Sequence, residues 1–190
     1  MILETIVTTR DETGRDHIAP MGIRREGGFI VLSPFRPSAT LEHVLREDCA
    51  VVNYTDDVRV FAGCLTGRYA WPTLPVEHLP CRRLAAALAH SEVRLERVQE
   101  DPTRPRLYCR EVAHVTHAAF AGFNRAQSAV IEAAILVSRL HMLPREKVDS
   151  EMAYLAIGLE KTAGPRELEA WGWLEARIRE FREADKESAA

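Results

Sequence analysis

The residues with the clearest potential for chemistry lie in the turn Arg36-Pro37-Ser38-Ala39-Thr40, between an apolar run and a segment with helical spacing. Arg36, Ser38 and Thr40 bring a guanidinium and two hydroxyls to the start of a helix. Such donors, together with the unpaired backbone N–H groups of a helix N-terminus, hold a phosphate well. A simple helix cap by Ser38 beside a solvated Arg36 explains the same residues, and on the residues alone both interpretations stay open.

A second unusual stretch is the apolar run over residues 17–24, which contains Pro20 and Gly22. Proline cannot donate a hydrogen bond to a neighbouring strand, and glycine leaves the backbone uncovered. The pair suits a strand edge, a bulge, or a place where a ligand lies against the main chain. A plain bulge and a ligand site explain these two residues equally well.

Other polar residues give weaker signals. The adjacent carboxylates Asp56 and Asp57 are more typical of turns and helix caps than of an acid–base pair, so Asp57 and Arg59 are at most supporting residues. His114 and His117 would point to opposite faces of a strand. The histidines form no ligand cluster, so the sequence predicts no metal site, and no residue stands out as catalytic.

The composition is that of an ordinary globular protein, with 46% hydrophobic and 28% charged residues among 190. A net charge of -3 and scattered arginines argue against nucleic acid as a partner. No apolar run approaches the roughly 20 residues that cross a bilayer, so we expect a cytoplasmic protein with no membrane contact. Four cysteines without any C-x-x-C pair are expected as reduced, partly buried core thiols, with a reactive thiol as the weaker alternative: Cys49, Cys64, Cys81 and Cys109.

The elements that must position these residues begin with strands. Strands are expected over residues 3–10, 17–24, 29–32, 49–55, 93–99 and 106–114. Helices are expected over residues 38–48 and 84–89. The stretch 58–80 mixes apolar residues with several prolines and is expected to be irregular.

After Gly122 the pattern changes to the helical period. One helix is expected from Asn124 to near Leu143, a second ends at Gly164, and a third begins at Pro165. Strands first and helices last predict an α+β fold, in which a small antiparallel barrel carries a C-terminal appendage of about three helices. The predicted domains are residues 1–121 and 122–185, followed by a flexible tail over 186–190.

The order of these motifs resembles the flavin-reductase-like, FMN-binding split-barrel proteins. In that superfamily a basic, hydroxyl-rich turn precedes a helix and then a strand of the type "VVN", as in Arg36-Pro37-Ser38-Ala39-Thr40 and Ala50-Val51-Val52-Asn53. Within it, nearly the whole chain resembles a family of unassigned activity from archaea and methanopterin-using bacteria. The stretches that carry this likeness include His17-Ile18-Ala19-Pro20-Met21-Gly22, Gly122-Phe123-Asn124-Arg125 and Lys161-Thr162-Ala163-Gly164-Pro165.

The resemblance implies an FMN site on particular residues. The flavin phosphate would bind at Arg36, Ser38 and Thr40. The ring would lie along the strand that contains Ala19, Pro20, Met21 and Gly22, with Thr8 and Asn53 placed to reach the flavin. Flavin sites of this superfamily lie at a dimer interface, so the resemblance also implies a homodimer.

These inferences lead to one main hypothesis and two rivals. The main hypothesis is an FMN-dependent oxidoreductase that acts on a small molecule, with a possible link to methanopterin-dependent one-carbon metabolism. The first rival is a non-catalytic FMN carrier or sensor. The second is a flavin-free barrel that serves only as a structural dimer.

Overall fold

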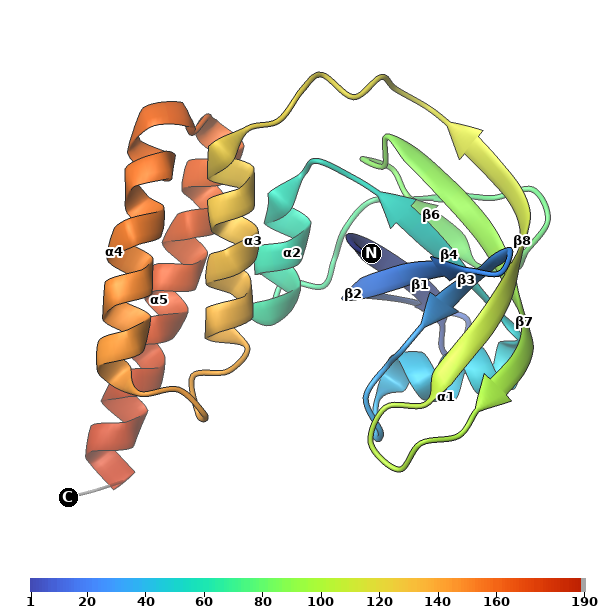
Figure 1. The fold of residues 1–190 in the computed structure, drawn as a ribbon, viewed down its shortest axis with the longest axis horizontal. Helices are drawn as coiled ribbons and strands as arrows, with labels where there is room; N and C mark the ends of the chain where they lie inside the picture. The colour runs from blue at the N-terminus through green and yellow to red at the C-terminus, as the bar shows by residue number, and fades with distance from the viewer. Residues whose placement is uncertain (189–190) are drawn as a thin grey trace. The chain divides into compact units, whose positions relative to one another are not determined.

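The computed structural model describes residues 1–188 of the chain (Figure 1). Its contacts divide it into two compact units. The barrel unit contains Met1–Asp56 and Tyr69–Phe120, and the helical unit contains Asp57–Arg68 and the chain from Ala121 onward. The barrel unit therefore differs from the expected first domain, residues 1–121, in one segment: residues 57–68 belong to the helical unit.

The barrel unit is built from six antiparallel strands. Their bounds are β1 Ile2–Arg10, β2 Asp16–Glu26, β3 Phe29–Leu32, β4 Cys49–Tyr54, β7 Ala89–Gln99 and β8 Arg106–Thr116. The order around the sheet is β1-β2-β3-β8-β7-β4, and the pairing of β4 with β1 closes it into a barrel. The hairpin between β2 and β3 turns on Gly27 and Gly28, whose φ angles of 56° and 84° suit glycine.

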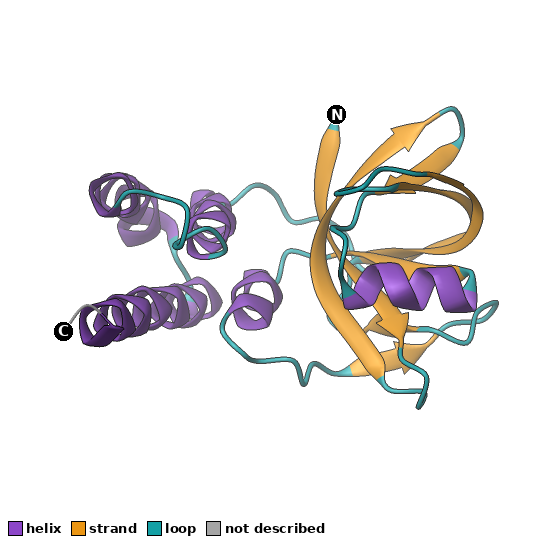
Figure 2. Cartoon of the chain, turned by 90° about the horizontal axis from the view of Figure 1, so that it is seen from below, coloured by secondary structure: helices purple, strands orange, loops and turns teal. Residues whose placement is uncertain are grey.

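Alternation along the strands fills the barrel with apolar side chains. Val7, Ile23, Leu32, Val52 and Leu107 are all fully buried in this interior core. Helix α1 spans Ala39–Glu47 and contributes Leu41 and Val44 to the same core. Figure 2 shows α1 among the strands of the barrel unit. A separate two-stranded sheet, β5 Thr73–Pro75 with β6 Arg82–Leu84, completes the unit.

The helical unit contains α2 Val58–Leu65, α3 Arg125–Val137, α4 Arg145–Thr162 and α5 Pro165–Ser188. The helices pack around a core of buried residues that includes Ala62, Val130, Ala134, Trp171 and Leu174. Among the described residues, no helix combines the length and the apolar composition that a bilayer crossing requires.

The predicted α+β class and the three C-terminal helices are confirmed, and two local expectations are wrong. Residues 58–65 form α2 instead of an irregular segment. Asp57 caps this helix, and six of its eight residues are buried, so packing in the helical unit stabilises it. Residues 84–89 are not helical, because Leu84 ends β6 and Ala89 begins β7, so tertiary pairing outweighs the helix propensity of the alanines. In the predicted tail, residues 186–188 belong to α5, and residues 189–190 lie outside the described part.

Candidate functional site

Ser38 caps helix α1 at its N-terminus. Its backbone is extended, with φ of -159°, and its Oγ accepts a hydrogen bond from the Leu41 N–H at 3.3 Å. The Glu42 N–H is bonded to the Ser38 carbonyl at 3.1 Å. Ala39 and Thr40 lie earlier in the first turn, where N–H groups have no helical acceptor. The start of α1 thus offers the Ser38 hydroxyl and two backbone donors to an anion.

Arg36 lies on the exposed turn just before this cap. Its guanidinium forms an ion pair with Glu100 at 2.9 Å, and both side chains are well exposed, at 40% and 68%. Its backbone N–H donates to the Thr103 carbonyl at 2.8 Å, which ties the turn to the loop between β7 and β8. Because an exposed ion pair contributes little free energy, the Arg36 guanidinium can exchange Glu100 for a phosphate at small cost.

The hydroxyls of this region differ in their exposure. Ser38 is half-buried, whereas Thr40 is only 4% exposed. Ser33, at the end of β3, is also buried, and its Oγ has no hydrogen-bond partner among the described residues. Sequence reasoning did not single out Ser33, although it directly precedes the Pro34 that opens the turn. Its hydroxyl is a buried donor without a partner among the described residues, next to the turn predicted to bind the phosphate.

Strand β2 has an edge that no strand covers. It pairs with β1 from Asp16 to Arg24, but with β3 only from Arg24 to Glu26. In the described part of the chain, the second edge of residues 19–23 therefore has no partner strand, and we call this segment the β2 edge. Every second residue of such an edge directs its N–H and C=O groups outward.

The predicted ring residues all lie on this edge and are half-buried. Pro20 contributes no N–H group, which is tolerated at an edge. A Cβ at Gly22 would lie 2.8 Å from the Ile2 side chain, so glycine allows β1 and β2 to pack closely there. Thr5 on β1 donates from Oγ1 to the Met21 carbonyl at 2.7 Å. The edge is thus held firmly from the β1 side and open on the other.

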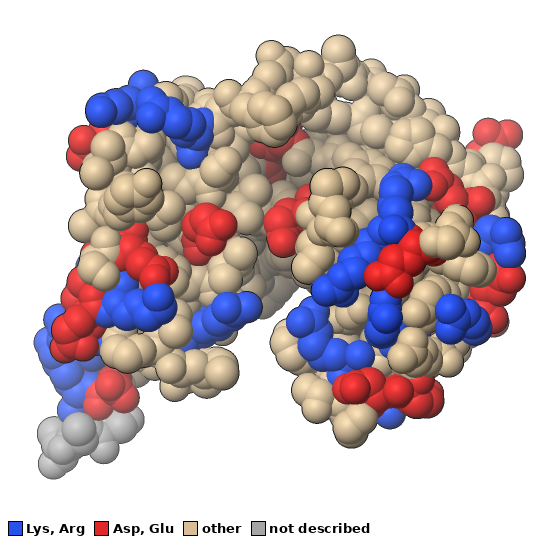
Figure 3. Space-filling model, in the orientation of Figure 1, with Lys and Arg blue, Asp and Glu red and all other residues tan. Residues whose placement is uncertain are grey.

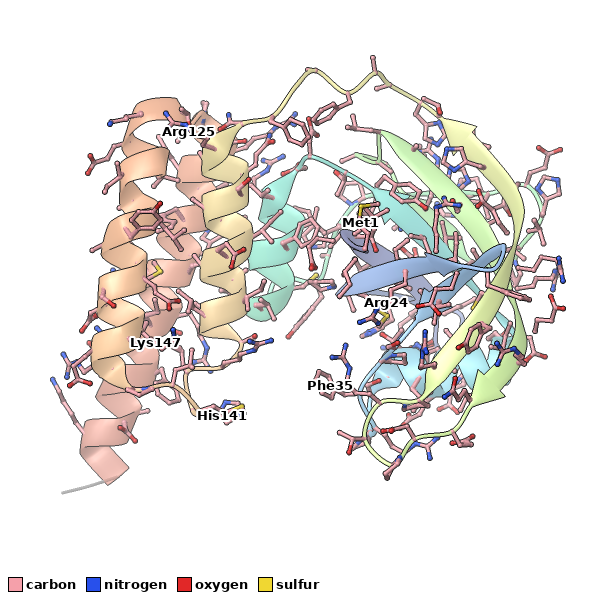
Figure 4. The ribbon with its side chains drawn as sticks, in the orientation of Figure 1. Met1, Arg24, Phe35, Arg125, His141 and Lys147 are labelled. Atoms are coloured by element: carbon pink, nitrogen blue, oxygen red, sulfur yellow. The ribbon has the colours of Figure 1, made fainter. Side chains whose placement is uncertain are left out.

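Arg24 is a further residue of interest, and no motif in the sequence points to it. It lies two residues beyond Gly22 on β2, so the two residues share one face of the strand. It is half-buried, and its side chain forms no hydrogen bond or ion pair within residues 1–188. Figure 4 shows Arg24 and Phe35 on the same side of the barrel unit. Unlike Arg24, other arginines of that unit lie next to acidic residues on the surface that Figure 3 shows.

Thr8 and Asn53 come together, but inside the barrel wall. Both are fully buried, and Asn53 Nδ2 donates to Thr8 Oγ1 at 2.9 Å and to the Ile6 carbonyl at 3.0 Å. Asn53 Oδ1 accepts from the Leu84 N–H at 2.8 Å. The amide of Asn53 therefore links β1, β4 and β6, and both of its polar atoms have partners within the fold.

Helix α1 is fixed to β1 and β2 through His43. Its Nδ1 lies 3.0 Å from Thr9 Oγ1, and its ring meets the ring of His17 edge-on at 5.2 Å. Burial lowers the pKa of both histidines below the ordinary value, and the neighbouring charge of His43 lowers that of His17 further. β2 thus connects the two halves of the candidate site, because His17 contacts α1 and the β2 edge follows directly.

The remaining polar candidates have structural roles. Asp57 caps α2 by accepting from the Arg59 N–H, and its carboxylate pairs with the Arg59 guanidinium at 2.7 Å. His114 and His117 have separate partners, Ser91 at 3.0 Å and His90 at 2.9 Å.

Comparison with known proteins places the chain in a family. A model of the N-terminal domain of DUF447, described as a protein of unknown function, matches residues 3–118, and a second model of that family matches residues 124–176. The chain belongs to the DUF447 family. The predicted resemblance to a family of unassigned activity is thereby confirmed. No curated protein matches this DUF447 chain.

Solved structures share the fold of this chain. An FMN-bound DUF447 protein from Methanosarcina mazei matches at 21% identity with a TM-score of 0.81, over 93% of this chain and 94% of that one. A 2-nitrobenzoate 2-nitroreductase from Pseudomonas fluorescens matches at 17% identity and a TM-score of 0.53, over 60% and 64% of the chains. Nitrilotriacetate monooxygenase component B from Bacillus cereus matches at 22% and 0.50, over 61% and 69%. At these identities the likeness establishes the fold of the DUF447 chain.

Proposed function

We propose that this DUF447 protein binds FMN and is a flavin-dependent oxidoreductase that acts on a small molecule. The observation that carries the proposal is the uncovered β2 edge at the residues expected to meet the ring. A fold shared with an FMN-bound member of the same family supports it, and so do fold relatives named as a nitroreductase and a monooxygenase component. We also propose that the barrel is of the FMN-binding split type, because β2 leaves part of the wall unpaired.

The residues present fit a flavin mononucleotide. Arg36, the Ser38 hydroxyl and the first N–H groups of α1 would hold the phosphate, which needs donors and positive charge. The Ser33 hydroxyl is a buried donor that lacks a partner in the described chain and lies next to this turn. Thr40 would contribute through its backbone N–H, because its side chain is buried.

The other end of the flavin would lie along the β2 edge. Backbone N–H and C=O groups of residues 19–22 would meet the polar edge of the ring. Arg24 would add a cation beside the ring or its side chain, without first having to break an internal ion pair. Thr8 and Asn53 would act indirectly, by holding β1 and β4 in register behind the site. Bound FMN would supply the electron transfer, and the chain would bind and orient it.

The biological setting belongs to the proposal as well. We propose a cytoplasmic homodimer in which the partner covers the flavin, because a half-buried ring platform leaves one face of a ligand open. The methanopterin link stays a prediction from the resemblance. A carrier or sensor would share the flavin site but would show no turnover.

Purified protein tests the proposal directly. Stoichiometric FMN, seen as flavin absorption bands after unfolding and release, is the expected result. A colourless protein that takes up no added FMN would contradict it. Anaerobic addition of NADH or NADPH then separates the two flavin-binding alternatives, because bleaching shows electron transfer and unchanged absorbance favours a carrier.

Single-residue variants test whether the turn before α1 binds the phosphate. Arg36→Ala is expected to weaken FMN binding by about tenfold or more, the value of one charge-assisted hydrogen bond. Arg15→Ala is a matched control, because Arg15 is also exposed and paired with one carboxylate, Asp11, at 2.9 Å in a different turn. Equal affinity of the Arg36 variant and the control would place the phosphate elsewhere.

A further inference from the structure

Two cysteines that are far apart in the sequence meet in the barrel unit. Cys49 is the first residue of β4, and Cys81 directly precedes β6. Their Sγ atoms are 3.5 Å apart, although 32 positions separate them in the chain. Both are 1% exposed and pack with Val51 and Leu79 in a small cluster of their own. The structure thus pairs two thiols that the sequence analysis treated as independent core residues.

The pair lies beside a hollow that opens to solvent. The hollow has a volume of about 270 Å³, and Cys81 forms part of its wall. Arg10, Asp16 and Arg82 also line it, so its wall is largely polar. A small polar reagent can therefore come close to Cys81, whose sulfur lies 3.5 Å from that of Cys49, even though both sulfur atoms are covered from bulk water.

The two thiols are chemically unequal. A hydrogen bond from the Cys81 thiol lowers the pKa of Cys49 below its ordinary value, outweighing burial, and the charge of Arg94 adds to this. The same pairing raises the pKa of Cys81. Cys49 is thus the thiol that more readily becomes a thiolate, the reactive form toward oxidants. By contrast, burial raises the pKa of Cys109 to about 12, which makes that thiol inert.

We propose that Cys49 and Cys81 are a redox-active dithiol that hydrogen peroxide converts into an intramolecular disulfide. The Cys49 thiolate attacks one peroxide oxygen, the O–O bond breaks, and hydroxide leaves and takes up a proton to become water. The resulting sulfenic acid is then attacked by Cys81 sulfur, the S–O bond breaks, and the Cys81 proton leaves with the oxygen in a second water. Two thiols lose two electrons in total, and one peroxide is reduced to two waters.

The geometry permits this step with a small local movement. A disulfide has an S–S length of about 2.05 Å, so the sulfur atoms must approach by about 1.5 Å. Cys49 is held in β4 by its pairing with Arg94 on β7. Cys81 ends a segment of bends between β5 and β6, where backbone adjustment is easier. The disulfide would fasten the β5–β6 hairpin to β4, and this inference does not depend on flavin binding.

Peptide mapping of the wild-type protein tests the proposal. Each cysteine lies in a different tryptic peptide, namely residues 47–59, 60–68, 69–82 and 107–110. The reduced protein is treated with a small molar excess of hydrogen peroxide, unfolded in alkylating reagent, digested and analysed without reduction. We expect peptides 47–59 and 69–82 joined with the loss of two hydrogen atoms, and separated again by dithiothreitol. Peptides 60–68 and 107–110 should carry the alkyl group, so two of the four thiols are lost.

Matched variants provide the control. Cys64→Ser and Cys109→Ser should form the linked peptide as the wild type does, whereas Cys49→Ser and Cys81→Ser should not form it. Full alkylation of all four cysteines after peroxide would overturn the proposal. Separate sulfinic acids on Cys49 and Cys81, or a disulfide between two chains on a non-reducing gel, would overturn it as well. The wild-type map alone decides the matter if a serine variant fails to fold.

Discussion

Replacing Asn53 with alanine tests whether this side chain braces the barrel. The change removes three donor contacts of the amide, to Thr8 Oγ1 at 2.9 Å, to the Ile6 carbonyl at 3.0 Å and, more weakly, to the Val51 carbonyl at 3.3 Å. It also leaves the Leu84 N–H, bonded to Asn53 Oδ1 at 2.8 Å, without its acceptor in a residue that is 1% exposed. A buried donor that is left without an acceptor lowers the free energy of unfolding by about 1–3 kcal/mol, and each lost hydrogen bond lowers it by about 0.5–1.5 kcal/mol. We expect the free energy of unfolding of the barrel unit to fall by about 3 kcal/mol, a large part of a typical total.

Amide hydrogen exchange at Leu84 is the most specific assay. A loss of about 3 kcal/mol corresponds to roughly 100-fold faster exchange where global opening controls it. The urea midpoint should fall by about 1.5 M for a slope of about 2 kcal/mol per molar. The control is Asn124→Ala, which changes the only other asparagine, the cap of α3 in the helical unit. It should leave Leu84 exchange unchanged. If Asn53→Ala also leaves Leu84 exchange unchanged, Asn53 does not brace the wall, and its amide is available to a ligand.

Three further predictions concern the titrating groups and the β2 edge. Burial raises the pKa of Glu92, but hydrogen bonds from His78 and its neighbour outweigh burial and hold that pKa below 4.5. The ionised Glu92 therefore stabilises the fold above that pH. Urea midpoints should show that the wild type loses more stability than Glu92→Gln as the pH falls below about 4.5. The pKa values of His17 and His43 are lowered in the fold, so the unfolded chain binds protons at higher pH than the folded chain. Stability should therefore fall as the pH drops below about 6.5, and NMR titration should give both rings a pKa under 6.5. A ring that titrates above this value would contradict the burial argument. Gly22→Val should lower FMN affinity by at least tenfold, measured by quenching of flavin fluorescence, because a Cβ at this position would lie 2.8 Å from the Ile2 side chain and would shift the β2 edge that is proposed to hold the ring; unchanged affinity would mean that the ring lies elsewhere.

The periodic elements could be predicted from the sequence because their patterns are local. Apolar alternation and turn residues predicted the strands, and the 3.6-residue period predicted the three C-terminal helices. Helix α2 was missed because its short apolar segment was interpreted together with the proline-rich stretch that follows it, from Pro72 to Pro80. The cap made by Ser38 was predicted because a hydroxyl before a helical period has a local cause.

The candidate site could be predicted only in part, because its remaining features depend on pairing between distant segments. Pro20 and Gly22 predicted a strand edge or a bulge, but the short β3 decides that the edge stays uncovered. The isolation of Arg24 follows from the register of the barrel strands. The contact between Cys49 and Cys81 follows from the packing of the segment before β6 against β4, and no local pattern encodes either feature. Predictions for Thr8 and Asn53 came from resemblance alone and gave no indication that the two side chains bond to each other.

A crystal structure of the protein with FMN tests the central claim most directly. The proposal predicts the phosphate within hydrogen-bond distance of the Ser38 hydroxyl and the Arg36 guanidinium, at the start of α1. It predicts the ring along residues 19–22 of β2, with backbone groups of the open edge bonded to its polar atoms. A phosphate away from the α1 turn, or a ring away from the β2 edge, would contradict it.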